Sequence, residues 1–128
     1  MPLGILEAIL DSTGVFIELK KIMQPYERFL ECKVDTDTEY HLDTKHIMNN
    51  NKPLFFGAVT VKKNYVSYHL MPVYVETTLL SGLTEKLKKH MHGKSCFNFK
   101  VLESDMLIEL KSLTDIGFNY YRENNLLG

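Results

Sequence analysis

The sequence predicts an α+β fold, a two-layer sandwich in which a mainly antiparallel five-stranded sheet carries N- and C-terminal helices on one face. Apolar residues recur at helical spacing near both ends of the chain, and four successive segments between them alternate apolar and polar residues. The connections between these segments are short, so neighbouring strands must be antiparallel. The chain has 128 residues, 45% of them hydrophobic. That is enough for a core, and we expect residues 1–128 to form one domain.

The first long helix is expected to begin near Ser12 or Thr13, whose hydroxyls suit an N-terminal cap. It should end at Gln24, because Pro25 lacks an amide hydrogen and disfavours helical geometry in the residue before it. Its expected buried positions are Phe16, Leu19, Ile22, Met23 and Tyr26. Residues 3–11 predict a shorter helix, with an apolar side formed by Ile5, Leu6, Ile9 and Leu10.

Four consecutive strands should follow, over residues 29–35, 38–43, 54–62 and 65–71. The run Asp35-Thr36-Asp37 is typical of a tight turn between the first two strands. Asn64 suits the turn before the fourth strand because asparagine tolerates positive φ. Pro72 should end that strand.

The C-terminal part predicts short helices, a fifth strand and a long helix. Residues 74–92 predict one or two short helices, with Thr84 as a cap and Gly93 as the stop. The fifth strand is expected over residues 94–100. Ser104 should cap the last helix, with Asp105 favourably placed in its first turn. Its expected buried stripe is Met106, Leu110, Leu113, Gly117, Phe118 and Tyr121.

Alternation gives each strand an apolar and a polar side. The apolar side should meet the helices: Leu30, Cys32, Val34, Tyr40, Leu42, Val66, Leu70, Phe97 and Phe99. The polar side should form an open face: Glu31, Lys33, Glu39, His41, Asp43, Tyr65, Ser67, His69, Lys94, Cys96, Asn98 and Lys100. The candidate ligand- or partner-binding residues on or beside it are Tyr65, Ser67, His69, Tyr74, Lys94, Cys96 and Asn98. The commoner alternative is the merely hydrated side of an antiparallel sheet.

Metal binding is a weaker hypothesis for the same face. Imidazole and carboxylate groups ligate zinc or iron, and the candidate ligands are His41, Asp43 and His69, with the carboxylates of residues 31–43 as an alternative set. Their spacing matches no recognised metal motif. The sequence therefore requires no cofactor, and iron is the metal to be considered.

Catalysis is also weakly indicated, and we assign no catalytic residue. Cys96 lies beside Lys94, which predicts a lowered thiol pKa, and Ser95 or Ser67 with His69 would be a nucleophile and its base. The nucleophile-elbow and phosphate-binding motifs are absent from the sequence. A free cysteine in a strand is more often a small hydrophobic residue, so an enzyme using Cys96 or His69 is the less favoured reading.

Charge and composition exclude several classes of partner. The net charge of −1 supplies no basic field for nucleic acid or an anionic membrane surface, and no apolar run approaches the ~20 residues of a membrane span. The lysine-rich residues 86–94 favour an exposed helix face, with attraction of an anionic ligand or acidic partner as the alternative. The N-terminal residues do not predict a signal peptide, and two cysteines make no disulfide framework. A cytoplasmic location is therefore expected.

Parts of the chain resemble the YdhG-like domains of unknown function. The resemblance lies in residues 65–74 (YVSYHLMPVY), residues 93–99 (GKSCFNF) and Leu110, Leu113, Thr114 and Gly117 of the last helix, and it extends over most of residues 15–122. It implies a frataxin-like α+β sandwich. One bacterial branch of that family is regarded as an iron chaperone for iron–sulfur cluster and haem assembly, and frataxins dock partners through the open sheet face.

The first helix departs from the frataxin pattern. Frataxins carry an acidic ridge there, whereas this chain has Glu18, Lys20 and Lys21. We therefore expect a small cytoplasmic ligand- or partner-binding domain that uses its open sheet face, as a monomer or homodimer. The alternatives are a frataxin-like iron-binding chaperone and, less favoured, an enzyme.

Overall fold

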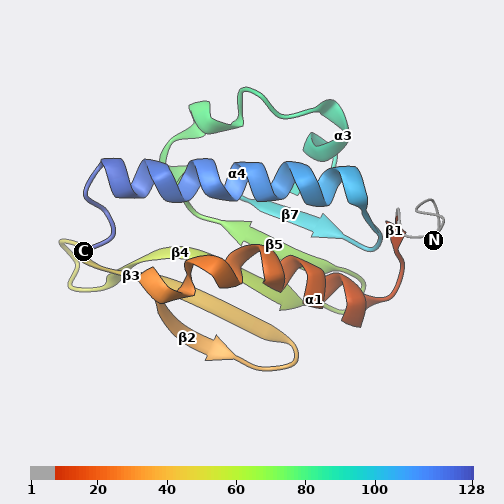
Figure 1. Cartoon of the computed structure of the whole chain (residues 1–128), viewed down its shortest axis with the longest axis horizontal. Coiled ribbons are helices and arrows are strands. Elements are labelled where there is room, and N and C mark those ends of the chain that lie inside the picture. The colour runs from red at the N-terminus through yellow and green to blue at the C-terminus, as the bar shows by residue number, and fades with distance from the viewer. Residues whose placement is uncertain (1–7) are drawn as a thin grey trace.

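The computed structural model describes residues 8–128, which form a two-layer α+β sandwich (Figure 1). One layer is an antiparallel sheet of six strands in the order β2–β3–β4–β5–β7–β6. Helices α1 and α4 lie side by side over one face of it. The strands are β2 (Glu31–Asp35), β3 (Glu39–Ile47), β4 (Pro53–Val61), β5 (Val66–Leu70), β7 (Cys96–Phe99) and β6 (Met91–His92). The predicted α+β class is confirmed, but the sheet has six strands where five were expected.

Helix α1 (Ser12–Met23) follows the predicted apolar spacing and buries Phe16, Leu19 and Ile22 among others. Its cap is Asp11, whose carboxylate accepts a hydrogen bond from the Gly14 amide at 3.2 Å. The prediction of Ser12 or Thr13 as the cap is wrong by one or two residues. The α-helix ends before Gln24, as expected, and the chain continues as the 3-10 helix η2 (Gln24–Phe29) with a proline in its first turn.

The helix predicted for residues 3–11 is wrong where it can be compared. Residues 3–7 lie outside the described part of the chain, and Ala8–Ile9 form strand β1. This strand pairs with β8 (Leu102–Glu103), the segment that leads into α4. A short apolar run is compatible with either a helix or a strand. Here the run forms a strand because it pairs with β8, a segment distant in sequence.

The segment between β5 and β7 holds less helix than predicted. It contains α2 (Pro72–Val75), η3 (Thr77–Leu80) and α3 (Glu85–Lys88), and Thr84 caps α3 as expected, its hydroxyl accepting from the Leu87 amide at 3.2 Å. Residues 91 and 92, expected in a helix, form β6 instead. Gly93 has a φ of +78° and lies in the turn of the β6–β7 hairpin. It therefore lets the chain reverse direction between two strands and does not end a helix.

A bulge between Cys32 and Val34 reverses the alternation of β2. Val34 pairs with His41 and therefore lies on the open face, so its predicted place under the helices is wrong. Asp35 moves to the helical side, where the Lys20 ammonium of α1 lies 2.6 Å from its carboxylate. Cys32 is exposed because β2 is an edge strand, so it is not the buried residue that alternation predicted.

Helix α4 (Ser104–Glu123) buries the predicted stripe of Met106, Leu110, Leu113, Gly117, Phe118 and Tyr121, and also Thr114. Its N-cap residue is Glu103, and no side chain caps the helix, so the cap predicted at Ser104 is wrong. Asp105 lies in the first turn as expected. The core is formed between this stripe, the inner side of α1 and the helix-facing side of the sheet.

Candidate functional site

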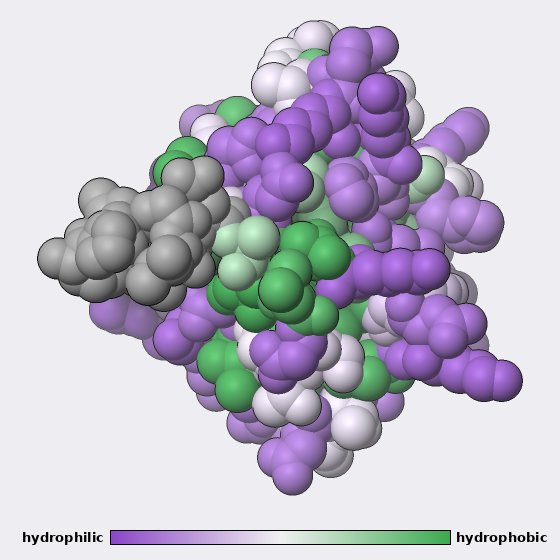
Figure 2. Space-filling model, turned by 90° about the vertical axis from the view of Figure 1, so that its right-hand side faces the viewer, coloured by the Kyte–Doolittle hydropathy of each residue, from purple (hydrophilic) through white to green (hydrophobic). Residues whose placement is uncertain are grey.

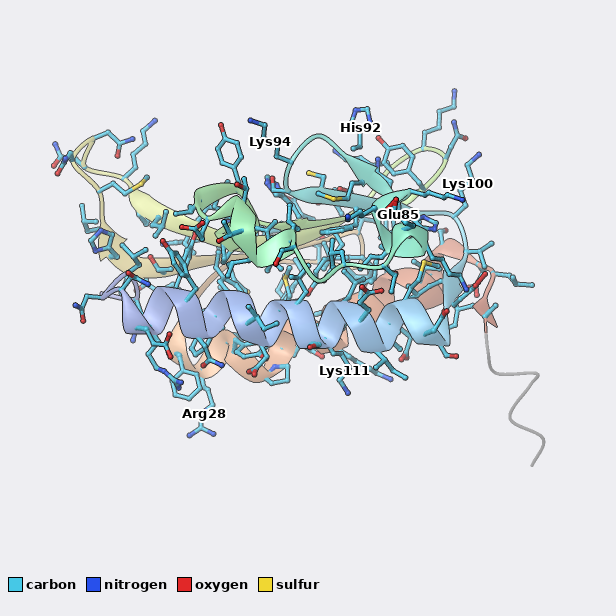
Figure 3. All side chains as sticks on the ribbon, turned by 90° about the horizontal axis from the view of Figure 1, so that it is seen from above. Arg28, Glu85, His92, Lys94, Lys100 and Lys111 are labelled. Carbon is cyan, nitrogen blue, oxygen red and sulfur yellow. The ribbon has the colours of Figure 1, made fainter. Side chains whose placement is uncertain are left out.

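The predicted open face lies on the side of the sheet away from α1 and α4. Residues that pair directly across antiparallel strands share a face. The pairings place His41, Ala58, His69, Cys96 and His92 in one row, and Glu39, Thr60, Ser67 and Asn98 in the next. Figure 3 shows His92, Lys94 and Lys100 projecting from the sheet on the side opposite α4. Ser67, His69, Lys94, Cys96 and Asn98 thus lie on the expected side, while their role in binding stays a prediction.

An aromatic group forms one end of this face. The Phe55 ring lies between the two imidazoles, 4.7 Å from the centre of His41 and 4.8 Å from that of His69. His41 Nε2 is 2.8 Å from Asp43 Oδ1, and His69 Nε2 is 2.9 Å from Ser95 Oγ. Both imidazoles are thereby held by a ring and a polar partner.

Phe55 was missed in the sequence. The register shift of β4 between Gly57, which pairs with Leu42, and Phe55, which pairs with Asp43, turns Phe55 to the open side. Its neighbour Phe56 is fully buried against the aromatic residues of the helices. The run Leu54-Phe55-Phe56 carries no alternation, so nothing in the sequence indicates which phenylalanine faces which way.

Burial shifts the titration of the open-face groups. It lowers the pKa of His69, and the nearby His41 lowers it further, which favours the neutral imidazole. Burial also raises the pKa of the Cys96 thiol and outweighs the opposing effects of Ser67 and Lys62. The expected lowering of this pKa by Lys94 is wrong, and a protonated thiol is a poor nucleophile.

The candidate metal ligands do not assemble into a site. Of His41, Asp43 and His69, only the first two are in contact, and Phe55 separates the two imidazoles. Within residues 8–128, no three histidine, cysteine, aspartate or glutamate side chains are arranged to hold a metal ion. Of the three candidate ligands, His41 and Asp43 are the pair in contact.

Three lysines give the open face an excess of positive charge. Lys62 continues the alternation of Thr60 and acts electrostatically on Cys96, and Lys94 and Lys100 project from the same side. In the described part of the chain, none of the three has a carboxylate within 4.0 Å. Among the carboxylates of this face, Glu31 pairs with the Lys33 ammonium and Asp43 contacts the His41 imidazole, which leaves Glu39 at the β3 end.

The lysine-rich residues 86–94 divide into two environments. Lys86 pairs with Glu103 and Asp105 beside α4, and Lys88 pairs with Glu85 on α3. These two are the exposed helix positions that the sequence favours. Lys94 lies in the β6–β7 turn and belongs to the open face instead.

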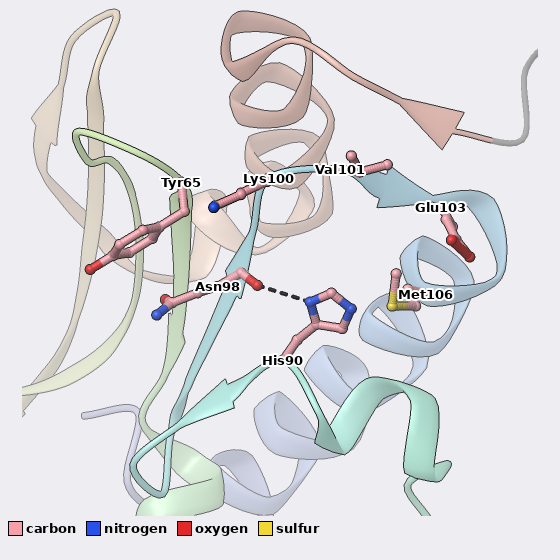
Figure 4. Close-up of a pocket in the computed structure, with 7 residues that line it drawn as sticks. All are labelled: Tyr65, His90, Asn98, Lys100, Val101, Glu103 and Met106. Atoms are coloured by element: carbon pink, nitrogen blue, oxygen red, sulfur yellow. Dashed lines mark hydrogen bonds between the residues drawn. The ribbon is translucent and has the colours of Figure 1, made fainter.

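The remaining candidates are Tyr65 and Tyr74. Tyr65 precedes β5 and, with Asn98 and Lys100, lines a pocket of about 430 Å³ whose other walls are His90, Val101, Glu103 and Met106 (Figure 4). Tyr74 lies in α2 and is exposed. His90, Val101 and Met106 were not predicted as site residues, because they join Tyr65 through contacts between distant segments.

No protein-family model matches the sequence, and searches of curated proteins and of solved structures found no match either. The helices within residues 8–128 are all too short or too polar to cross a lipid bilayer. The site must therefore be interpreted from its own geometry.

Proposed function

We propose that this protein is a binding domain whose open sheet face receives the acidic surface of a protein partner. The observation that carries the proposal is that Lys62, Lys94 and Lys100 all lie on a sheet face against which neither α1 nor α4 packs. Lys62 and Lys100 lie near the beginning of β5, and Lys94 lies near its end. Charged groups of one sign on a binding face steer an oppositely charged partner and fix its orientation. Three lysines that have no carboxylate within 4.0 Å among residues 8–128 supply that charge.

The shape of the face supports contact with a surface. Its central positions carry the small side chains of Ala58, Thr60 and Ser67. A face built on hydrogen-bonded strands is rigid, so a partner meets groups that are already in position. The raised pKa of Cys96 argues against the enzyme alternative.

The family assignment is part of the proposal. Apart from the short strands β1 and β8, the elements follow the order of a helix, four strands, a helical segment, a hairpin and a long helix, which supports a YdhG-like domain of frataxin-like architecture. A cytoplasmic location is proposed with it. The iron-binding alternative rests on the contact between His41 and Asp43. Anaerobic titration with ferrous ion tests it, and unchanged histidine resonances at micromolar iron would remove it.

Titration of the ¹⁵N-labelled protein with a ten-residue oligoglutamate peptide tests the acidic-partner proposal. We expect amide shifts in β4, β5 and β7, and the double variant Lys62→Ser/Lys94→Ser should weaken binding roughly three- to tenfold, since exposed ion pairs are each worth about 0.2–1 kcal/mol. Binding should also weaken with added salt.

The matched control is Lys21→Ser/Lys111→Ser, which removes the same charge from α1 and α4. It should retain the affinity of the wild type to within twofold. Shifts confined to α1 and α4, or an equal loss in both double variants, would contradict the proposal.

A further inference from the structure

The pocket beside Tyr65 lies at the end of the molecule where β1 is found and α4 begins. Figure 2 shows this end, with a hydrophobic area bordered by hydrophilic side chains. The volume of about 430 Å³ is in the range of small-molecule sites, roughly 300–1,000 Å³. Within the lining, Val101 is 37% exposed and Met106 only 2%, so both a rim and a floor are apolar.

Lys100 supplies the positive charge in the lining of the pocket. The lining holds two groups that are charged at neutral pH whatever the state of His90, namely Lys100 and Glu103. Glu103 is in an ion pair with Lys86, whose ammonium also lies 2.8 Å from Asp105. Lys100 has no carboxylate within 4.0 Å among residues 8–128. The Lys100 ammonium is therefore the group in the lining that an anion can contact.

Polar backbone groups lie at the edge of β7 beside the pocket. His90 covers this edge at Asn98: its carbonyl accepts from the Asn98 amide at 2.8 Å, and its Nδ1 donates to the Asn98 carbonyl at 3.0 Å (Figure 4). Lys100 follows β7 outside the strand, and in the described part of the chain no hydrogen bond is found for its backbone groups.

The His90 ring makes a fixed wall. It stacks on Phe99, with ring centres 4.8 Å apart and planes at 23°, and the bond from Nδ1 fixes its orientation. Since Nδ1 carries the proton, the neutral ring presents Nε2 as a hydrogen-bond acceptor. The pocket therefore combines an anion-binding side, an apolar side and one acceptor.

We propose that this pocket binds a small organic acid, a molecule with an aromatic or branched apolar body and one carboxylate or sulfonate group that contacts Lys100. The apolar body lies against Val101 and Met106, and a donor on the ligand reaches His90 Nε2. A peptide added as a strand fits less well, because β6 and His90 already cover this edge of β7.

Binding of 8-anilinonaphthalene-1-sulfonate, an aromatic sulfonate, tests the proposal. In ¹H–¹⁵N spectra we expect shifts of the amides of His90 and of residues 98–103. Lys100→Met should weaken binding about tenfold, whereas binding of the uncharged N-phenyl-1-naphthylamine should change less than twofold. Val101→Glu, which places a carboxylate in the apolar wall, should weaken binding of both probes.

The controls carry the same substitutions elsewhere: Lys111→Met on the outer side of α4 and Val75→Glu in α2, both of which should bind like the wild type. No saturable sulfonate binding up to 1 mM, shifts outside the pocket, or equal effects of Lys100→Met and Lys111→Met would overturn the proposal. This inference goes beyond the acidic-partner proposal, and Lys62→Ser/Lys94→Ser should retain probe binding, so the two can fail separately.

Discussion

His69 lies on the open face with its ring held on two sides. Phe55 packs against it with the ring planes at 70°, and Ser95 Oγ is within hydrogen-bond distance of Nε2. Burial and the neighbouring His41 both disfavour the imidazolium, so the pKa of His69 is lowered in the folded protein. The open face is thus uncharged at this position at neutral pH, and its positive charge comes from the lysines.

The lowered pKa of His69 predicts a pH dependence of stability. The folded state binds a proton at His69 less tightly than the unfolded chain, whose histidines have pKa values near 6.5. The contribution of His69 to the free energy of unfolding is therefore complete above about pH 7.5 and decreases as the pH falls through about 6.5. Urea unfolding at pH 7.5 and pH 5.0 should show a smaller loss of stability for His69→Gln than for the wild type.

His92→Gln is the matched control, since His92 is exposed and projects from the sheet (Figure 3). It should keep the pH dependence of the wild type. An unchanged dependence in His69→Gln, or an NMR titration midpoint of His69 at or above about 6.5, would contradict the assignment.

The sequence predicts four consecutive strands and a separate fifth strand. The β6–β7 hairpin adds the sixth strand of the sheet. Met91 pairs with Phe97 and His92 with Cys96, across the turn that contains Gly93. The hairpin brings His92 and Lys94 to the open face and His90 to the pocket. Its geometry depends on the positive φ of Gly93.

Gly93→Ala should therefore destabilise the fold by about 1 kcal/mol, because an alanine at positive φ is strained. Gly82→Ala is the control, since a Cβ there meets nothing within 4 Å and its φ is not in the left-handed region. Chemical denaturation should show no loss of stability for Gly82→Ala. Equal effects of the two substitutions would mean that the turn does not require glycine.

At the level of the molecule, α4 is joined to the centre of the sheet by a buried polar contact. The hydroxyls of Tyr68 and Thr114 are 2.6 Å apart, and both residues are fully buried. Thr114 donates to the Leu110 carbonyl at 2.7 Å, so the Tyr68 hydroxyl is the donor in the contact between the layers. Burial raises the pKa of Tyr68, which keeps that donor protonated.

Thr114→Val should destabilise the protein by about 1–3 kcal/mol, because the substitution leaves the Tyr68 hydroxyl buried without a partner. Tyr68→Phe should cost less, about 0.5–1.5 kcal/mol, since Thr114 keeps its bond to Leu110. The loss of stability in the double variant should be smaller than the sum of the losses in the two single variants. Guanidinium denaturation measures the stability of all three variants. A larger loss for Tyr68→Phe than for Thr114→Val would contradict the assignment of Tyr68 as the donor to Thr114.

The local pattern of the chain was sufficient for the long elements and for much of the open face. The spacing of Leu110, Leu113 and Phe118 predicted the buried stripe of α4, and alternation placed Ser67, His69 and Asn98 on one side of the sheet. Both patterns are set by backbone geometry within a few residues, so they can be read without knowing the partner segments.

Pairing between segments distant in sequence determined the remaining features of the fold and of the site. Bulges turned Val34 and Phe55 to the open face, β1 formed against β8, and the hairpin at Gly93 carried His90 to Tyr65 and Met106. Each of these depends on which strand lies alongside, and a shift of register by one residue reverses the face of every side chain that follows. The amino-acid order therefore specified a helical layer and a polar sheet face that includes Lys94 and Lys100, while the pocket arose from long-range pairing that no local pattern encodes.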